Sequence, residues 1–306
     1  MRWLVVCAAP GLAALACGSK TDLLIGSDQA PATSGAFGSE VPPEAGSAGS
    51  SGSAGAAAGA PALCDSTELP PPQSLLHRYS FTGTGKVITD SVQGVAGDGA
   101  LKGSDGSALT GAGVLQLKGI DGYVDLPDGL ISKLSEVTLM AWVSWPGGYA
   151  YQRIFDFGNT TLGADPMWPG STYSGASYLA ASPYTAFKPG ENVGIELKTK
   201  STPTTNYGAV VSMKDGALHQ VSVVFRDHEG AQLYVDAKLE GALRTPNAVL
   251  SEIEDVNDWL GRSQTSKDTA YKGTFSEFRI YGKALSGCVI ANELAAGPDL
   301  APLSAP

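Results

Sequence analysis

The segment from residue 159 to residue 190 carries side chains that could bind a ligand. It holds Asp165, Trp168, Tyr173, Tyr178 and Tyr184 among glycine, serine and proline residues. Long loops in compact domains are usually functional or disordered, and aromatic rings beside polar groups suit the apolar faces of sugar rings. We therefore predict a glycan-binding site that includes Asp165, Trp168, Tyr173 and Tyr178. The alternative is that these aromatics cover a sheet edge or pack on the rest of the fold.

Charged residues interrupt otherwise apolar stretches elsewhere in the chain: Arg153, Asp156, Glu277 and Arg279. An unpaired buried charge would cost several kcal/mol, so buried ion pairing is the first interpretation. The alternative is that Asp156 and Asn159, which lie next to a turn, reach the ligand. Trp259 and Arg262 are candidates to lie near the same ligand, and we include Arg262 in the predicted site.

The residue patterns of common catalytic sites do not occur in the sequence. It contains no G-x-S-x-G and no H-E-x-x-H, and His77, His219 and His228 have no metal-ligand spacing. We therefore predict that the protein is not an enzyme. The formal charge of -10, without a basic cluster, also makes nucleic acid an unsuitable partner, because an acidic surface repels a phosphate backbone.

Strands must position the candidate site residues, and residues 137–158 show the clearest strand pattern in the sequence. Apolar side chains recur at period two from Val137 to Trp145, and Met140 and Trp142 fill the other face. This strand is therefore expected to be buried on both sides, inside a sandwich or barrel. A second, neighbouring strand is expected after the Pro-Gly-Gly turn that follows it.

Further alternating segments are separated by glycine-rich turns along the rest of the chain. They are residues 77–81, 114–117, 123–126, 195–197, 210–213, 220–225, 233–235 and 278–280, with a turn at 227–230 that predicts a hairpin. The only segment compatible with a helix is 289–296. Strands without intervening amphipathic helices predict an all-β fold, an antiparallel sandwich of two sheets.

The first residues have the features of an export signal. Arg2 is followed by an apolar stretch from Leu4 to Ala16, too short to span a bilayer as a helix, and Leu15-Ala16-Cys17-Gly18 ends it. This ending resembles the lipobox of bacterial lipoproteins, which implies a signal peptide over 1–17, acylation of Cys17 and sorting to the outer membrane. The alternative is an ordinary secretion signal.

Residues 18–63 consist mainly of glycine, alanine, serine and proline and have no periodicity that could bury a face. Such a segment is expected to stay disordered as a linker. We predict one folded domain over 64–297 and a flexible tail over 298–306. Cys64 and Cys288 bracket the domain, which suggests one disulfide across it.

Taken in order, seven motifs resemble those of the LamG-like jelly roll of the concanavalin A-like lectin/glucanase superfamily. They are H-R-Y-S-F with I-T-D-S (77–91), D-G-Y-V-D-L-P (121–127), V-T-L-M-A-W-V (137–143), R-I-F-D-F-G (153–158), L-Y-V-D (233–236), W-L-G-R-S (259–263) and F-R-I-Y-G-K-A-L-S (278–286). The resemblance implies two curved antiparallel sheets with the first and last strands side by side. That topology would bring Cys64 near Cys288. A disulfide between them would suit an oxidising compartment outside the cytoplasm.

The resemblance also bears on metal binding and catalysis. Family members often hold Ca²⁺ at an early D-S turn, which implies a calcium site at Asp90, although Ser276 replaces the usual acidic residue of the last strand. The alternative is that Asp90 caps a turn. Related glucanases carry an E-x-D-x-E strand, and the nearest stretch here, 252–257, has Val256 in the third acidic place.

The sequence therefore predicts a lipid-anchored module of the cell envelope, held to a membrane through Cys17, that recognises glycans without catalysis. A protein-binding or adhesion module of the same fold is the alternative, and a glycan hydrolase is a third. The sequence does not predict the ligand, the oligomeric state or the side of the outer membrane that the domain faces.

Overall fold

The computed structural model describes residues 64, 65 and 67–298. The predicted signal peptide with Cys17, the predicted linker and all but the first residue of the predicted tail lie outside these residues. The regular structure of the described part is mainly β-strand, with two short 3₁₀ helices, η1 (Gly94–Gly97) and η2 (Leu250–Glu252), and one α-helix, α1 (Gly287–Ala296). No helix of this part is long and apolar enough to cross a membrane.

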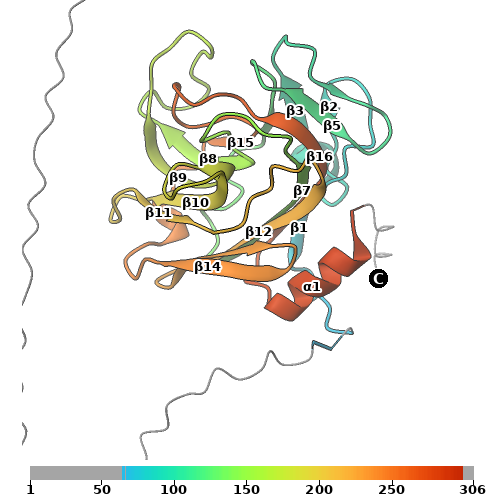
Figure 1. Ribbon diagram of the computed structural model, residues 1–306, viewed down its shortest axis with the longest axis vertical. Helices are drawn as coiled ribbons and strands as arrows, with labels where there is room; N and C mark the ends of the chain where they lie inside the picture. Colours follow the sequence, from blue (N-terminus) through green and yellow to red (C-terminus); the bar gives the residue numbers. More distant parts are fainter. Residues whose placement is uncertain (1–63, 66, 299–306) are drawn as a thin grey trace, which may run out of the picture. The chain divides into compact units, whose positions relative to one another are not determined.

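Sixteen strands form two antiparallel sheets of eight strands each. Sheet A has the order β14 (Lys238–Arg244), β13 (Gly230–Val235), β12 (Leu218–Arg226), β7 (Glu136–Ser144), β16 (Lys272–Tyr281), β5 (Leu115–Lys118) and β4 (Ala108–Leu109), and β1 (Leu75–Tyr79) also pairs with β16. Sheet B has the order β11 (Thr205–Gly208), β10 (Asn192–Lys198), β9 (Gly175–Thr185), β8 (Phe155–Thr160), β15 (Asn257–Leu260), β6 (Tyr123–Leu126), β3 (Gly99–Lys102) and β2 (Val87–Ile88). This is the two-sheet sandwich that the sequence predicts (Figure 1).

Strand β7 is central in sheet A and buried on both faces, as its pattern predicts. Leu139, Ala141 and Val143 belong to the large core that also contains Phe155 and Phe157 of sheet B. Met140 and Trp142 lie on the opposite face, in a second core with Val289 and Ile290 of α1. The helix thus covers part of the outer face of sheet A, where Figure 1 shows it next to the end of β14. We refer to this second cluster as the outer core.

Two predictions about strands are wrong. The strand after the Pro-Gly-Gly turn, β8, does not pair with β7, because the chain crosses there from sheet A to sheet B. Residues 210–213 are not a strand, although Val211 accepts a backbone hydrogen bond from Val193 N at 3.1 Å. Val210 is 81% exposed, so the V-V pair there reflects an irregular edge and not a buried strand.

The remaining predicted elements are confirmed. Strands β12 and β13 form a hairpin around the turn at 227–230, and α1 occupies the predicted helical segment. Strand β1 pairs with β16, which places the two ends of the domain side by side. A disulfide joins Cys64 to Cys288, with 5.1 Å between their Cα atoms.

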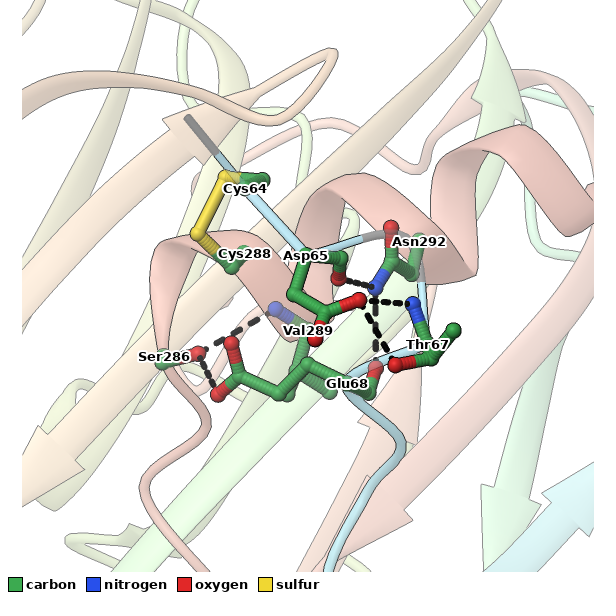
Figure 2. Close-up of a disulfide and its surroundings, with 8 residues drawn as sticks. All are labelled: Cys64, Asp65, Thr67, Glu68, Ser286, Cys288, Val289 and Asn292. Atoms are coloured by element: carbon green, nitrogen blue, oxygen red, sulfur yellow. Dashed lines mark hydrogen bonds between the residues drawn. A yellow bond between two sulfur atoms is a disulfide. The ribbon is translucent and has the colours of Figure 1, made fainter. Parts of the chain in front are cut away.

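Polar contacts around the disulfide tie the first described residues to α1 (Figure 2). Ser286 caps the helix, since its Oγ accepts a hydrogen bond from Val289 N at 3.2 Å, and it donates to Glu68 at 2.8 Å. The side-chain amide of Asn292 donates to the carbonyl oxygens of Asp65 and Glu68 at 2.9 and 2.8 Å. Asp65 and Glu68 are therefore held against the helix.

Candidate ligand-binding site

The outer face of sheet B carries a row of side chains that point away from the main core. In register across neighbouring strands lie Asp125 of β6, Trp259 of β15, Asp156 of β8, Ala180 of β9 and Glu196 of β10. Phe155 and Phe157 point into the main core, so period two sends Asp156 to the opposite face. Two connections pack near this row, residues 161–174 between β8 and β9 and residues 261–271 between β15 and β16.

Arg262 of the second connection lies among four aromatic rings. Its guanidinium carbon is 3.7 Å from the ring centroid of Trp259, 4.7 Å from that of Tyr123, 5.3 Å from that of Trp168 and 5.7 Å from that of Tyr173. Contacts of a cation with ring faces at this range are favourable, more so where water is excluded, and Arg262 is only 2% exposed. We call these five residues the arginine–aromatic box.

Hydrogen bonds fix the guanidinium group in this box. Arg262 donates to the carbonyl oxygen of Pro166 at 2.7 Å and to the hydroxyl oxygen of Tyr173 at 2.9 Å. Among residues 64–298, with residue 66 left aside, no carboxylate forms an ion pair with it. The rings therefore take the place of a counter-ion, and Arg262 anchors the loop that carries Trp168.

Trp168 and its neighbours form the accessible side of the box. Its indole is half-buried and meets Tyr123 edge to face, with 6.2 Å between ring centroids. Met167 is 70% exposed and Leu162 is 56% exposed, and Asp165 is also exposed. An exposed apolar surface therefore lies beside the carboxylate of Asp165, and the contacts of Arg262 hold the loop that carries this surface in place.

Further carboxylates stand near this surface. Burial raises the pKa of Asp125, and the negative charge of Asp165 raises it further, while Lys102 at 3.4 Å opposes the shift. Burial and the charges of Asp165 and Asp125 likewise raise the pKa of Asp128. Asp125 accepts a hydrogen bond from the indole N–H of Trp259 at 3.1 Å, which links it to the arginine–aromatic box.

A second cluster, next to the box, consists of buried charges around Arg153. This residue forms ion pairs with Asp156 at 3.4 Å, with Asp268 at 3.4 Å and, at closer range, with Glu196. Burial raises the pKa of Asp156 to about 7, and Glu196 and Asp268 add to the shift, while Arg153 and the backbone N–H of Gln264 oppose it. The buried contact expected between Arg153 and Asp156 is therefore present, and it becomes an ion pair above about pH 7, where the carboxyl of Asp156 is ionised.

The raised pKa of Asp156 predicts a stability that depends on pH. The folded state holds a proton on this carboxyl up to about pH 7, whereas the unfolded chain releases it near the ordinary pKa of 3.8. The free energy of unfolding should therefore fall as pH rises through this window, and Asp258, whose pKa burial also raises, acts in the same direction. We expect the melting temperature to be several degrees higher at pH 5 than at pH 8.

The isosteric variant Asp156→Asn tests the origin of this effect, since an amide does not titrate. We expect a flatter plot of melting temperature against pH between 5 and 7 than for the unaltered protein. An identical slope in both proteins would show that Asp156 does not hold the proton.

The structure separates the seven residues predicted for the ligand site. Arg262, Trp168 and Tyr173 come together in the box, and Asp165 lies beside it, with its backbone N–H bonded to Asn257 at 2.7 Å. Asn159 lies elsewhere and donates to Glu254 at 2.9 Å. Asp156 is 1% exposed and belongs to the cluster around Arg153.

Two of the tyrosines predicted for the ligand site, Tyr173 and Tyr178, are buried. Tyr173 is 4% exposed, since its hydroxyl binds Arg262, and Tyr178 is 7% exposed. Tyr178 lies within β9, opposite Gly158 and Lys198, so residues 175–185 are sheet and not part of a long loop. Asp156 and these two tyrosines offer little surface to a ligand where they lie.

Sequence reasoning missed Tyr123 and Asp125 as members of the site. In the motif Y-V-D-L, Val124 and Leu126 are buried in the main core, so the alternating Tyr123 and Asp125 must lie on the outer face. That signal was present in the sequence. Glu196 and Asp268 were missed as well, and only the fold brings them to Arg153.

Both carboxylate oxygens of Asp90 accept hydrogen bonds. They accept from the imidazole of His77 at 2.7 Å and from the backbone N–H groups of Arg78 and Val92 at 3.2 and 2.8 Å. These contacts favour the role of a turn cap. Among the described residues no cluster of three acidic, histidine or cysteine side chains could hold a metal ion. The calcium site stays a prediction.

The acidic run at 252–255 has structural partners. Glu252 accepts hydrogen bonds from Thr199 and Ser201 at 2.8 and 2.6 Å. Asp255 accepts from the backbone N–H groups of Ile131 and Ser132 at 2.7 and 2.9 Å, and so shapes the loop before β7. Glu254 pairs with Lys200 at 2.8 Å on the surface. Each of these carboxyls therefore has a structural partner.

Comparison with known proteins confirms the family. The sequence profile of the concanavalin A-like lectin/glucanases superfamily matches residues 118–291, more than half of the chain. The chain belongs to this superfamily. The matched region includes every ring of the arginine–aromatic box. No curated protein sequence matches the chain closely enough to be reported as a relative.

Solved structures of concanavalin A-like shape resemble the chain at low identity. A sialidase from Trypanosoma rangeli has a TM-score of 0.52 and 14% identity, with 77% of this chain and 36% of the sialidase covered. The receptor-binding domain of botulinum neurotoxin type G has a TM-score of 0.50 and 13% identity, with 72% and 51% covered. Domain 4 of an arabinanase from Geobacillus stearothermophilus has a TM-score of 0.49 and 18% identity, with 72% and 98% covered. The chain thus spans about a third of the sialidase, and these likenesses concern the fold.

Proposed function

We propose that the protein is a non-catalytic glycan-binding module. The observation that carries this proposal is the half-exposed indole of Trp168, which Arg262 and Tyr123 hold in place beside the exposed carboxylate of Asp165. A pre-positioned ring costs little conformational entropy on binding, and the apolar face of a sugar can lie on it. Carboxylate oxygens beside the ring can accept hydrogen bonds from sugar hydroxyl groups.

The burial of Asp156 and Glu196 supports binding without hydrolysis at the cluster around Arg153. A glycosidase needs two carboxyl groups that flank the scissile bond and are open to the substrate. Asp156, whose pKa lies near 7, is 1% exposed, and Glu196 is 6% exposed, since both surround Arg153. The alternative of a hydrolase predicts release of reducing ends when the protein is incubated with the glycan that it binds, and no release is expected.

The variant Trp168→Ala should lose most of the affinity for glycan. Removal of a stacking ring is expected to weaken binding about tenfold or more, which corresponds to about 1.4 kcal/mol or more. Calorimetric titration with a retained glycan measures the change. The matched control is Tyr149→Ala, which removes an aromatic ring that is 73% exposed outside this site and should leave the affinity unchanged. Equal affinities of Trp168→Ala and the unaltered protein, at equal melting temperatures, would exclude the site.

A protein-binding or adhesion module is the second candidate, and exposed apolar side chains favour it. Leu162 and Met167 flank Asp165 and Trp168 on one connection, and such a surface can equally receive a protein with a basic rim, since the net charge is -10. Retention of a basic protein by the unaltered chain but not by Trp168→Ala, together with no retention of any glycan, would favour this function.

We also propose that the protein is anchored by lipid at Cys17 and resides in the outer membrane. The sequence L-A-C-G after a short apolar stretch supports this location, because several acyl chains hold a protein firmly on a bilayer. In a bacterial host, Cys17→Ala should abolish incorporation of a labelled fatty acid and release the protein from the membrane fraction. Unchanged incorporation would exclude this anchor.

A further inference from the structure

A groove lies on the outer face of sheet A, on the opposite sheet from the arginine–aromatic box. Its volume is about 430 Å³, and it is formed by the ends of β12 and β14, the start of β13, and the turn between β12 and β13. This volume lies within the range of ordinary small-ligand sites. The groove is on the face that α1 covers elsewhere, since Val224 lines it and also belongs to the outer core. We call it the β12–β14 groove.

The register of three strands explains why the groove exists. Arg226 of β12 pairs with Gly230 of β13, and Gly230 pairs with Arg244 of β14. The middle strand therefore has no side chain between the two arginines, whose Cα atoms stand about 10 Å apart at two strand spacings. Gly230 has a φ of +103°, and a Cβ there would lie 2.0 Å from the carbonyl oxygen of Leu243, so the position is restricted to glycine.

The floor of the groove combines small or apolar side chains with one amide. In the next row outward from Gly230 on the same face, Val224, Gln232 and Ala242 stand in register, and all three line the groove. The amide of Gln232 can donate and accept hydrogen bonds, and the small side chain of Ala242 leaves room above the sheet. A ligand with hydroxyl groups fits this floor better than a purely apolar one.

The charge of the groove is positive in a protein of net charge -10. Arg244 is exposed and has no ion pair among the described residues. Arg226 donates a hydrogen bond to the carbonyl oxygen of Ala284 at 3.4 Å, and its contacts with carboxylates are long, 3.8 Å to Glu229 and 4.0 Å to Glu136. Glu229 is the one acidic residue in the lining, and its side chain is 69% exposed.

His228 adds a polar ring at the mouth. It has a φ of +64°, which is uncommon for a residue with a side chain, and its backbone N–H donates to Ala248 O at 2.9 Å. Its Nδ1 lies 3.2 Å from the carbonyl oxygen of Pro246, and this contact assigns the hydrogen to Nδ1. The second ring nitrogen, Nε2, is then left for a ligand or for water.

From this arrangement we infer that the β12–β14 groove binds the carboxylate of an acidic sugar. Arginine pairs with carboxylates through two parallel N–H···O bonds, and Arg244, which has no ion pair among the described residues, can form such a pair, while Arg226 adds positive charge at the opposite wall of the groove. Gln232 and His228 supply partners for ring hydroxyl groups. The negative charge of the remaining surface repels long polyanions. The class of ligand that fits is therefore a single acidic sugar unit.

Nuclear magnetic resonance titration of the full chain with methyl glucuronide and with methyl glucoside tests this inference. The two probes differ in the carboxylate, so we expect the glucuronide to shift resonances of residues 226–232 and 242–246 and to bind about tenfold more tightly than the glucoside. Equal binding of both probes, or no shifts at these residues, would overturn the inference.

Variants in the groove give a second set of outcomes. Arg244→Gln should weaken glucuronide binding about tenfold or more, whereas Glu229→Gln should strengthen it, because it removes the acidic residue of the lining. Lys238→Gln is the matched control, since it removes a positive charge from the same strand outside the groove and should change nothing. Unchanged binding in Arg244→Gln at an unchanged melting temperature would contradict the site.

The Trp168→Ala variant separates this groove from the site on sheet B. It should bind methyl glucuronide at the β12–β14 groove as the unaltered protein does. Loss of that binding in Trp168→Ala would overturn the assignment to the groove, whatever ligand the arginine–aromatic box holds.

Discussion

Replacement of Glu277 by alanine is expected to lower the free energy of unfolding by roughly 3–5 kcal/mol, the cost of breaking a buried ion pair from one side. Glu277 is fully buried in the outer face of sheet A. It accepts hydrogen bonds from Arg78 at 2.7 and 3.2 Å and a closer one from Arg279. Both arginines are themselves buried, so the substitution would leave positive charge in the protein interior without its central partner.

The surrounding contacts make this position hard to compensate. Arg279 also pairs with Glu293 of α1, and its guanidinium carbon lies 4.4 Å from the ring centroid of Trp142. The hydroxyl of Tyr281 donates to Glu293 at 3.0 Å. The network therefore joins β1, β16 and α1, and its loss should loosen the helix as well as the sheet.

Denaturant unfolding of Glu277→Ala and of a matched surface variant measures this effect. Glu254→Ala breaks the exposed pair with Lys200 and should leave the unfolding midpoint nearly unchanged. Should Glu277→Ala fail to fold, Glu277→Gln, which keeps an acceptor oxygen, is expected to fold with an intermediate midpoint. Midpoints of Glu277→Ala and Glu254→Ala that coincide would contradict the account of the buried network.

The second large effect is expected on loss of the disulfide between Cys64 and Cys288. Removal of a native disulfide from an extracellular domain typically costs about 2–5 kcal/mol, and the separation of 224 residues places this bond at the upper end on chain-entropy grounds. The bond joins the first described residues to α1, beside the contacts of Asn292 and Ser286 (Figure 2). Without it, β1 and α1 should exchange their amide hydrogens sooner than the centre of the sheets.

Melting with and without a reducing agent checks this prediction. Reduction should lower the melting temperature of the unaltered protein, and the double variant Cys64→Ser with Cys288→Ser should melt at the same low temperature under both conditions. A reductant without effect on the unaltered protein, after the thiols are shown to be free, would mean that the bond does not support the fold.

The fold could be predicted from the sequence where the apolar pattern of a strand matches the surfaces against which the strand packs. Strand β7 has apolar residues on both faces because one face meets the main core and the other meets α1. The disulfide was predictable because β1 and β16 pair in this family. The burial of β7 can be read from the alternation of its own residues. The disulfide can be read from the motifs of the superfamily at the two ends of the domain.

Strand β9 was missed because its sequence, G-A-S-Y-L-A-A-S-P-Y-T, has weak strand propensity. Its pairing with β8 and β10 supplies the strand instead. Pro183 is tolerated because the ladder with β8 has its last pair at Ala181 and therefore needs no N–H from residue 183. Tertiary pairing thus decides a conformation that local composition does not.

The arginine–aromatic box could be predicted only in part, because contacts between distant segments complete it. Trp168, Tyr173 and Arg262 were recognised as aromatic and charged residues in connections, yet the placement of Arg262 among four rings depends on two connections that are far apart in sequence. A break in register between Phe275 and Glu277 likewise turns Glu277 to the outer face, where Arg78 meets it. A one-residue irregularity of this kind leaves no mark in the sequence pattern.

The most direct test of the proposed function is a glycan array probed with the unaltered protein and with Trp168→Ala in parallel. The account predicts saturable retention of a defined class of sugar by the unaltered protein, loss of that retention in Trp168→Ala and its persistence in Tyr149→Ala. A folded, disulfide-closed protein that retains no glycan, or one whose retention is the same in Trp168→Ala, would contradict it.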